Sequence, residues 1–219
     1  MEYSAQQPYV QPRERISTAR LLGQVMFLVA VAIGFLALGT FLGRDLSVGT
    51  ARICSFVGLG MLLVASFAPG RLFRVGPFAV IWLYALALMI GLGLGPVIEY
   101  FATTDPQVVT QAAGMAALIT VGMGAAGFAW DRDLSGWMRP LSYLVLGAVV
   151  ISFVMLLFGG GGNPIISGVI GVLSAALILV DFNFLRKHGT EEHAVMLATG
   201  IFVSIVNIFI SLLNILGGR

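Results

Sequence analysis

Seven long apolar segments divide almost the whole chain, and they limit what it can fold into. Their approximate bounds are 21–43, 49–68, 77–98, 108–129, 139–158, 164–185 and 194–216. About 20 apolar residues suffice for an α-helix to cross the hydrocarbon core of a bilayer. Only 10% of the 219 residues are charged, against about a quarter in a soluble domain. The sequence therefore predicts an all-α polytopic membrane protein, with seven transmembrane helices over 21–219 and a disordered tail over 1–20.

Positive charge is concentrated in the connections on one side of these helices. The tail and the breaks after the second, fourth and sixth segments hold Arg13, Arg15, Arg20, Arg71, Arg74, Arg132, Arg139, Arg186 and Lys187. The other breaks and the C-terminus hold only Arg44, Arg52 and Arg219. Cytoplasmic loops of membrane proteins are enriched in Lys and Arg. We therefore expect the N-terminus in the cytoplasm and the C-terminus outside.

The last apolar segment carries its polar and small residues on one face. Gly200, Ser204, Asn207, Ser211 and Asn214 follow one another at steps of four, three, four and three. On an α-helix this spacing forms one narrow stripe. Polar groups are costly in hydrocarbon unless they meet protein or water, so the stripe predicts an inner helix that faces the bundle or a wet cavity. The alternative is a packing face of small residues, which needs no transport function.

The preceding segment repeats this pattern and ends it in a carboxylate. Ser167, Gly171, Ser174, Ile178 and Asp181 fall at the same steps and share a face. Among the acidic residues of the sequence, only this Asp lies well inside an apolar segment. An acid within a membrane helix is a candidate functional residue, and it should have an identifiable partner.

The partners of Asp181 can be predicted from its depth in the membrane. Arg71 and Arg74 lie at the same cytoplasmic level and are possible ion-pair partners, and Ser204 could donate a hydrogen bond. Alternatively, Asp181 lies one turn from the interface and forms an ordinary helix-end ion pair with Arg186. The position of the residue leaves both interpretations open.

This chain lacks residues that several other classes of membrane protein require. A retinal protein requires a Lys in its last helix, but the single Lys, Lys187, lies in a connection. An intramembrane serine protease requires a His deep in a helix, but His188 and His193 lie at the surface. With Glu191 and Glu192 they could bind a metal, although such a short connection is typical of a polar turn. We therefore expect no enzyme, no metal site and no cofactor, and the basic residues form no nucleic-acid-binding run.

Three sequence motifs follow one another along the chain. They are Gly91–Pro96, Phe128–Trp137 with its Asp133-Leu134-Ser135, and Leu179–Asn183 followed by Val206–Leu213. Together they resemble the Bax inhibitor-1 family of membrane proteins over nearly the whole chain after the tail. The resemblance implies a seven-helix bundle with the last helix central, in the inner (plasma) membrane of a bacterium. It also implies a pH-sensitive leak channel in which calcium is the transported ion.

The resemblance further implies a proton-sensitive latch of two aspartates, one on each of the last two helices. The first falls on Asp181, but the register of 206–213 places the second on Ser204. Two adjacent carboxylates share a proton because both cannot ionise cheaply, and a Ser removes this effect. We therefore expect a weaker or shifted pH gate at Asp181 and Ser204. The predicted ion path or polar seam consists of Asn207, Ser211, Asn214 and Ser174. The alternative is a non-conducting membrane partner that binds or regulates a membrane protease or another complex.

Overall fold

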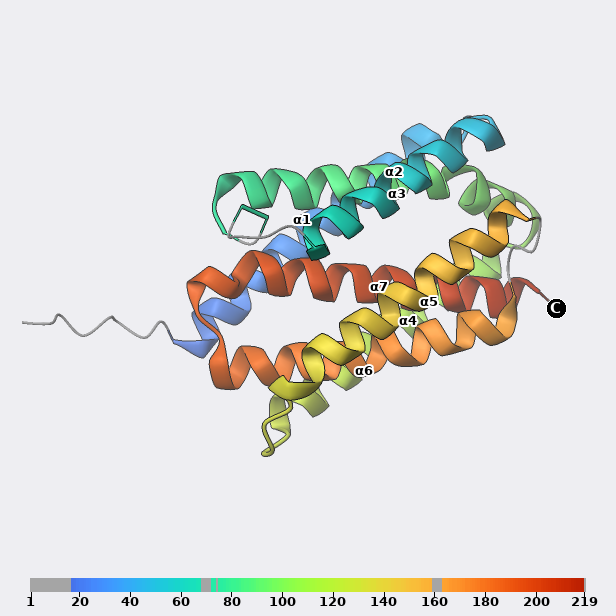
Figure 1. The fold of residues 1–219 in the computed structure, drawn as a ribbon. Helices are drawn as coiled ribbons and strands as arrows, with labels where there is room; N and C mark the ends of the chain where they lie inside the picture. Colours follow the sequence, from blue (N-terminus) through green and yellow to red (C-terminus); the bar gives the residue numbers. More distant parts are fainter. Residues whose placement is uncertain (1–16, 68–71, 74, 159–162, 219) are drawn as a thin grey trace, which may run out of the picture.

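The computed structural model describes residues 17–67, 72–73, 75–158 and 163–218. Within these ranges the chain forms seven helices that are long and apolar enough to cross a membrane. In chain order they are α1 (Thr18–Gly43), α2 (Val48–Phe67), α3 (Pro77–Thr104), α4 (Pro106–Ala129), α5 (Ser135–Leu157), α6 (Pro164–His188) and α7 (Ala194–Gly217), with a short 3-10 helix η1 (Glu191–His193) before α7. The described chain begins and ends at opposite ends of one bundle (Figure 1). The predicted all-α fold with seven spans is confirmed.

Hydrogen bonding decides where these helices begin and end. α1 begins at Thr18, inside the stretch predicted as a tail, because the side chain of Ser17 accepts a hydrogen bond from the Arg20 N–H. Residues 1–16 of that tail lie outside the described residues. α3 continues beyond its predicted end at 98 as far as Thr104, where the main-chain N–H of Asp105 still donates to the carbonyl of Phe101. Pro106 then begins α4, where its missing N–H leaves no bond unmade.

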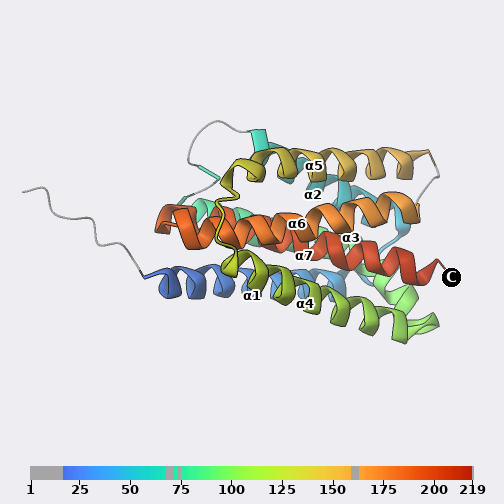
Figure 2. The ribbon, with the colours of Figure 1, turned by 90° about the horizontal axis from the view of Figure 1, so that it is seen from below.

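α7 is the central helix of the bundle, as predicted. It is buried over a larger share of its length than the other described spans, and it packs against α1, α3, α4 and α6. α2 and α5 lie at the periphery, where α2 packs on α3 and α5 packs on α6. Figure 2 shows α6 and α7 running side by side through the middle of the bundle. The polar stripes of these two helices are therefore placed at its centre.

Glycines bring α1 and α3 into close contact at two levels. A Cβ atom added to Gly39 would lie 3.1 Å from the Cα of Gly91. One added to Gly95 would lie 2.6 Å from the carbonyl oxygen of Gly43. Neither helix could carry a side chain at these points without moving away from the other. The glycines of α3 thus allow its backbone to approach that of α1 closely.

Candidate functional site

The polar stripes of α6 and α7 face each other along one seam. At the end near the C-terminus, Asn214 Nδ2 donates a hydrogen bond of 3.3 Å to Ser167 Oγ. Further along, Gly171 packs against Ser211, so that a Cβ atom added to the glycine would lie 3.2 Å from the Cβ of the serine. The two sequence patterns thus form one interface, here called the α6–α7 seam.

Asp181 lies at the other end of the α6–α7 seam, and only 3% of its surface is exposed. A Cβ atom added to Gly200 would lie 3.0 Å from Asp181 Oδ2, so Gly200 faces the carboxylate directly. Ser204 is buried one helical turn further along α7. Within the described ranges, Asp181 Oδ2 has no hydrogen-bond partner, so the expected bond from Ser204 does not reach this oxygen. The register of the antiparallel helices explains this difference, because it brings residue 200 to the level of the acid.

The structure describes one of the three predicted cationic partners of Asp181. Arg71 and Arg74 lie outside the described residues. Arg186, the partner in the helix-end alternative, instead donates to the carbonyl of Trp130 at 2.7 Å. The same guanidinium lies 3.6 Å from a carboxylate oxygen of Asp131. Arg186 therefore points away from Asp181 and toward the α4–α5 connection.

A cavity of about 780 Å³ lies beside Asp181, between α2, α5, α6 and α7. Asp181, Ser204 and Asn207 line it, whereas Ser174, Ser211 and Asn214 of the predicted path are not among its lining residues. The cavity extends from His193, at the end of η1, along α7 to Asn207, about 21 Å at the rise of an α-helix. Its lining thus connects the α6–α7 turn with the middle of the bundle.

Three polar atoms of the α6–α7 seam lack hydrogen-bond partners within the described part of the chain. They are Asp181 Oδ2, Asn207 Nδ2 and Ser174 Oγ, all buried. Buried polar groups are almost always satisfied by protein, by water or by a ligand. Two of the three residues, Asp181 and Asn207, line the cavity. The cavity is therefore suited to hold water or ions in contact with the seam.

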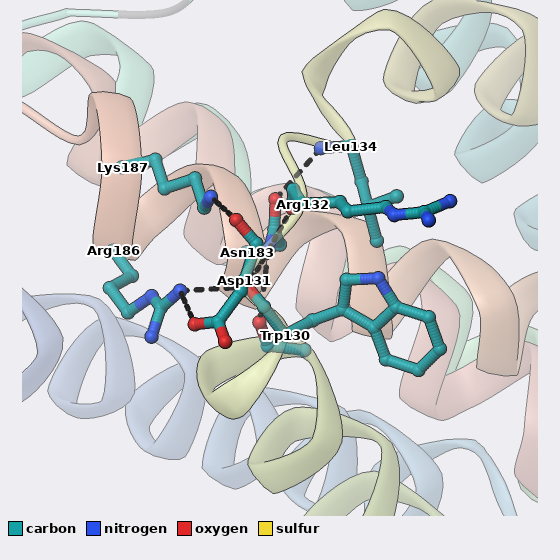
Figure 3. Close-up of polar contacts among 8 residues, drawn as sticks. Trp130, Asp131, Arg132, Leu134, Asn183, Arg186 and Lys187 are labelled. Carbon is teal, nitrogen blue, oxygen red and sulfur yellow. Dashed lines mark hydrogen bonds and ion pairs between the residues drawn. The ribbon is translucent and has the colours of Figure 1, made fainter.

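Asn183 is the centre of a hydrogen-bonded set that our sequence analysis did not find. Its Oδ1 accepts a bond of 2.9 Å from the N–H of Leu134. Its Nδ2 donates to the carbonyls of Gly127, Trp130 and Arg132 at 3.2, 3.0 and 3.1 Å. Figure 3 shows the α4–α5 connection wrapped around this side chain, which is fully buried. We call this set the Asn183 clasp.

Two basic residues of α6 extend the Asn183 clasp. Arg186 donates to Trp130, as described above, and Lys187 Nζ donates to the carbonyl of Asp131 (Figure 3). Both lie in the last turn of α6, where a positive charge is favourable to the helix dipole. The α4–α5 connection is thus bound to the end of α6 by side chains from one helix.

The two histidines near the α6–α7 turn also have partners. His188 Nε2 lies 2.7 Å from Asp133 Oδ2, and His193 Nδ1 lies 2.9 Å from the hydroxyl of Thr190. The N–H of Ser135, and then the imidazole of His188, hold the pKa of Asp133 at about 2, below its usual range. Within the described ranges, no group of three or more His, Cys, Asp or Glu side chains is placed to hold a metal ion.

Known membrane proteins match this chain over nearly its full length. A family model described as inhibitor of apoptosis-promoting Bax1 matches residues 18–219. An uncharacterized membrane protein of Vibrio cholerae is 26% identical over 212 residues, which cover 92% of this chain and 91% of the relative. The modulator of FtsH protease YccA of Escherichia coli is 26% identical over 208 residues, with 92% and 91% covered. In another strain of that species, a relative with the same match is named inner membrane protein YccA. The chain belongs to the Bax inhibitor-1 family.

Proposed function

We propose that this protein is a cation leak pathway whose gate lies at Asp181, with calcium as the cation. The observation that carries the proposal is the cavity that reaches Asp181, whose buried Oδ2 has no hydrogen-bond partner among the described residues. Carboxylate, amide and hydroxyl oxygens are the ligands that Ca²⁺ prefers, and Ser204 and Asn207 supply the last two kinds. The family implies calcium as the ion.

The composition of the cavity favours weak binding, which a leak requires. Among its described lining residues, Asp181 is the one carboxylate, and the positive charge of Arg139 in the same lining opposes tight cation binding. A conducting site must attract an ion and also release it, so a single acid with neutral oxygen ligands suits passage better than storage. The expected affinity for Ca²⁺ is correspondingly low, because affinity rises with the number of charged ligands.

The packing beyond Asn207 supports a path that is closed in this conformation. Ser211 lies against Gly171, and Leu213 is buried in a small cluster with Val108 and Ala112. Ions that enter the cavity from the α6–α7 turn therefore meet packed side chains in the other half of the bundle. We place that turn on the cytoplasmic side of a bacterial inner membrane, as the distribution of Lys and Arg supports.

Calcium flux into liposomes that contain the purified protein tests this proposal. Asp181→Asn should change the leak rate and its pH dependence between about pH 6 and pH 8, because it removes the one carboxylate among the described lining residues of the cavity. Asp105→Asn is the matched control, since Asp105 is exposed in the connection between α3 and α4. If the wild-type protein carries no calcium, or if both variants behave alike, the proposal is wrong.

The position opposite Asp181 offers a second test. A second carboxylate introduced on α7 should steepen the pH dependence of flux, because adjacent acids share a proton. The effect should be largest for the substitution that lies closest to Asp181. The geometry favours Gly200→Asp over Ser204→Asp, since the Cβ of the former would lie 3.0 Å from Asp181 Oδ2. A larger effect at Ser204 would contradict the register described above.

A second candidate function is the regulation of a membrane protease through binding. The specific observation that favours it is the E. coli relative named modulator of FtsH protease, which matches across 92% of this chain. The tagged full-length chain would then co-purify with FtsH from crosslinked membranes of its own host and change the rate of substrate cleavage. Asp181→Asn should leave both results unchanged, so this variant separates regulation by binding from ion conduction.

A further inference from the structure

α5 forms a wall of the cavity although it is the least buried of the described membrane spans. Val145 is the one described residue of α5 that is buried, and the extensive packing of this helix is against α6. Lipid is as apolar as the outer side chains of α5, so moving this helix exposes little apolar surface to water. Its wall residues include Met138, Ser142, Tyr143, Leu146 and Val149. A movement of α5 would therefore change the cavity at low energetic cost.

One end of α5 is fixed much more firmly than the other. The N–H of Leu134, immediately before the helix, donates to Asn183 Oδ1, and Asn183 Nδ2 binds three carbonyls of the same connection. Toward Leu157, the described residues form no comparable set of polar contacts with a neighbouring helix. The Asn183 clasp therefore holds the first turn of α5 against α6, whereas the described remainder of the helix has no comparable polar attachment.

A flexible point lies between the fixed turn and the cavity wall. Pro140 lies within α5 and has no N–H, so the carbonyl of Gly136 loses its helical partner. The hydroxyl of Ser142 donates to the carbonyl of Met138 at 2.7 Å, and such back-bonding often bends a helix. Gly136 itself is exposed, with no neighbouring atom where a Cβ would lie. These features place a hinge in the second turn of α5.

Beyond Pro140, α5 meets α2 through aromatic pairs on the peripheral side of the cavity. The rings of Phe56 and Phe153 lie 5.4 Å apart, edge to face, and those of Phe67 and Tyr143 lie 6.1 Å apart and are stacked. Such pairs can separate into lipid without leaving a buried hydrogen bond unmade. We propose that Asn183 is a positioning residue that fixes the start of α5, and that the rest of α5 swings from α2 about Pro140 to open the cavity. The inference rests on the proposed function for its effect on flux, whereas the movement can be measured separately.

Distances between pairs of spin labels test the movement in the full-length protein in liposomes. Cys54 is replaced by Ser, because it is the single cysteine of the sequence. One label is placed at Leu118 of α4, which is 75% exposed to lipid. The second label is placed either at Leu157, at the far end of α5, or at Trp137, within the fixed turn; both are exposed. We expect a wide or two-component distribution for Leu157 and a narrow one for Trp137. Equally narrow distributions at both sites would overturn the inference.

Two variants test separately the hinge at Pro140 and the fixing of the first turn of α5 by Asn183. Pro140→Ala, at an exposed position, should remove the wide component at Leu157 because it restores the missing helical bond. Asn183→Asp keeps an acceptor for Leu134 but cannot donate to the three carbonyls, so the Trp137 distribution should widen. A purely structural role for Asn183 would lower the yield of folded protein and leave the Trp137 distribution narrow, and this result would contradict the inference.

Flux measured on the same samples separates this inference from the proposed function. If the protein conducts calcium, Pro140→Ala should slow the flux, since the cavity opens less often. An unchanged flux in Pro140→Ala, with the wide component lost, would show that α5 does not gate the path and would overturn the inference. A protein that shows the movement but conducts no calcium would overturn the proposed function and support the hinge itself.

Discussion

Replacing Asn183 with Leu should open the α4–α5 connection and leave the seven-helix bundle folded. Leu has a similar volume and suits an apolar surrounding, but it can form none of the four hydrogen bonds of Asn183. The N–H of Leu134 loses its acceptor, and the carbonyls of Gly127 and Arg132 lose the Nδ2 donor. The perturbation is therefore confined to the Asn183 clasp.

The size of the effect follows from these bonds. A neutral hydrogen bond contributes about 0.5–1.5 kcal/mol net to stability. The bond to Gly127 is buried, whereas the other three are partly buried, and Trp130 keeps its second bond from Arg186. We therefore expect the free energy that holds the connection closed to fall by about 2–3 kcal/mol. A loss of this size raises the population of the open form roughly 30- to 150-fold.

Hydrogen exchange of the Trp137 amide measures this population. That N–H donates to the carbonyl of Leu134 at 2.9 Å, so it exchanges when the connection opens. Exchange in Asn183→Leu should accelerate by the factor given above. Asn214→Leu is the matched control, because it makes the same chemical change but removes a bond to Ser167 at the other end of α6. Unchanged exchange at Trp137 in Asn183→Leu would refute the role that we assign to Asn183.

Two further predictions concern the packing of α1 on α3 and the charge near the Asn183 clasp. Gly95→Ala should lower the melting temperature, because the new Cβ would lie 2.6 Å from the carbonyl oxygen of Gly43, and overpacking costs about 1–3 kcal/mol; Gly147→Ala, where a Cβ meets open space, should melt no lower than wild type. The carboxyl carbon of Asp133 should titrate with a pKa of about 2 in nuclear magnetic resonance spectra, and in His188→Ala this pKa should rise because a hydrogen bond is lost. Since this pKa is lowered, the stabilising effect of the carboxylate is present above about pH 4 and lost as the pH falls through about 2. An unshifted titration in His188→Ala would contradict the second prediction.

The helices could be predicted because hydrophobicity and length determine which segments cross a membrane. The end of α3 could not, because main-chain hydrogen bonding continues past the apolar segment as far as the bond from the Asp105 N–H to the carbonyl of Phe101. Apolar content marks where lipid ends, whereas hydrogen bonding decides where a helix ends. The two limits coincide at the start of α6, where Asn163 accepts a bond from the Ile165 N–H.

The sequence predicts which faces of α6 and α7 form the candidate site. It does not predict which residues of the two helices lie at the same height. Spacing alone placed Asp181, Ser204 and Asn207 on facing stripes, because residues three and four apart share one side of a helix. The residue that faces Asp181 depends on the axial register of α7 relative to α6. The turn between the two helices contains η1, and the polar pattern does not encode its geometry. Gly200 therefore faces the acid in place of Ser204.

Asn183 was missed for a different physical reason. Its partners are main-chain groups of the α4–α5 connection, and the main chain is the same in every sequence. The available signal was the residue itself, since an Asn within an apolar segment must satisfy its amide somewhere. Its position outside the polar stripe of α6 shows that these partners had to come from another side of the helix.

Asp181 and Asn183 act on different sides of α6, and this arrangement limits which helix can move. They are two residues apart, so their side chains point about 200° apart around the helix. Rotating α6 to move Asp181 away from Gly200 would therefore also pull Asn183 from its four main-chain partners. The same hydrogen bonds that hold the start of α5 thus keep the acid in place. A cavity bounded by a fixed α6 and a central α7 can widen most easily on its peripheral side, where α5 and α2 meet.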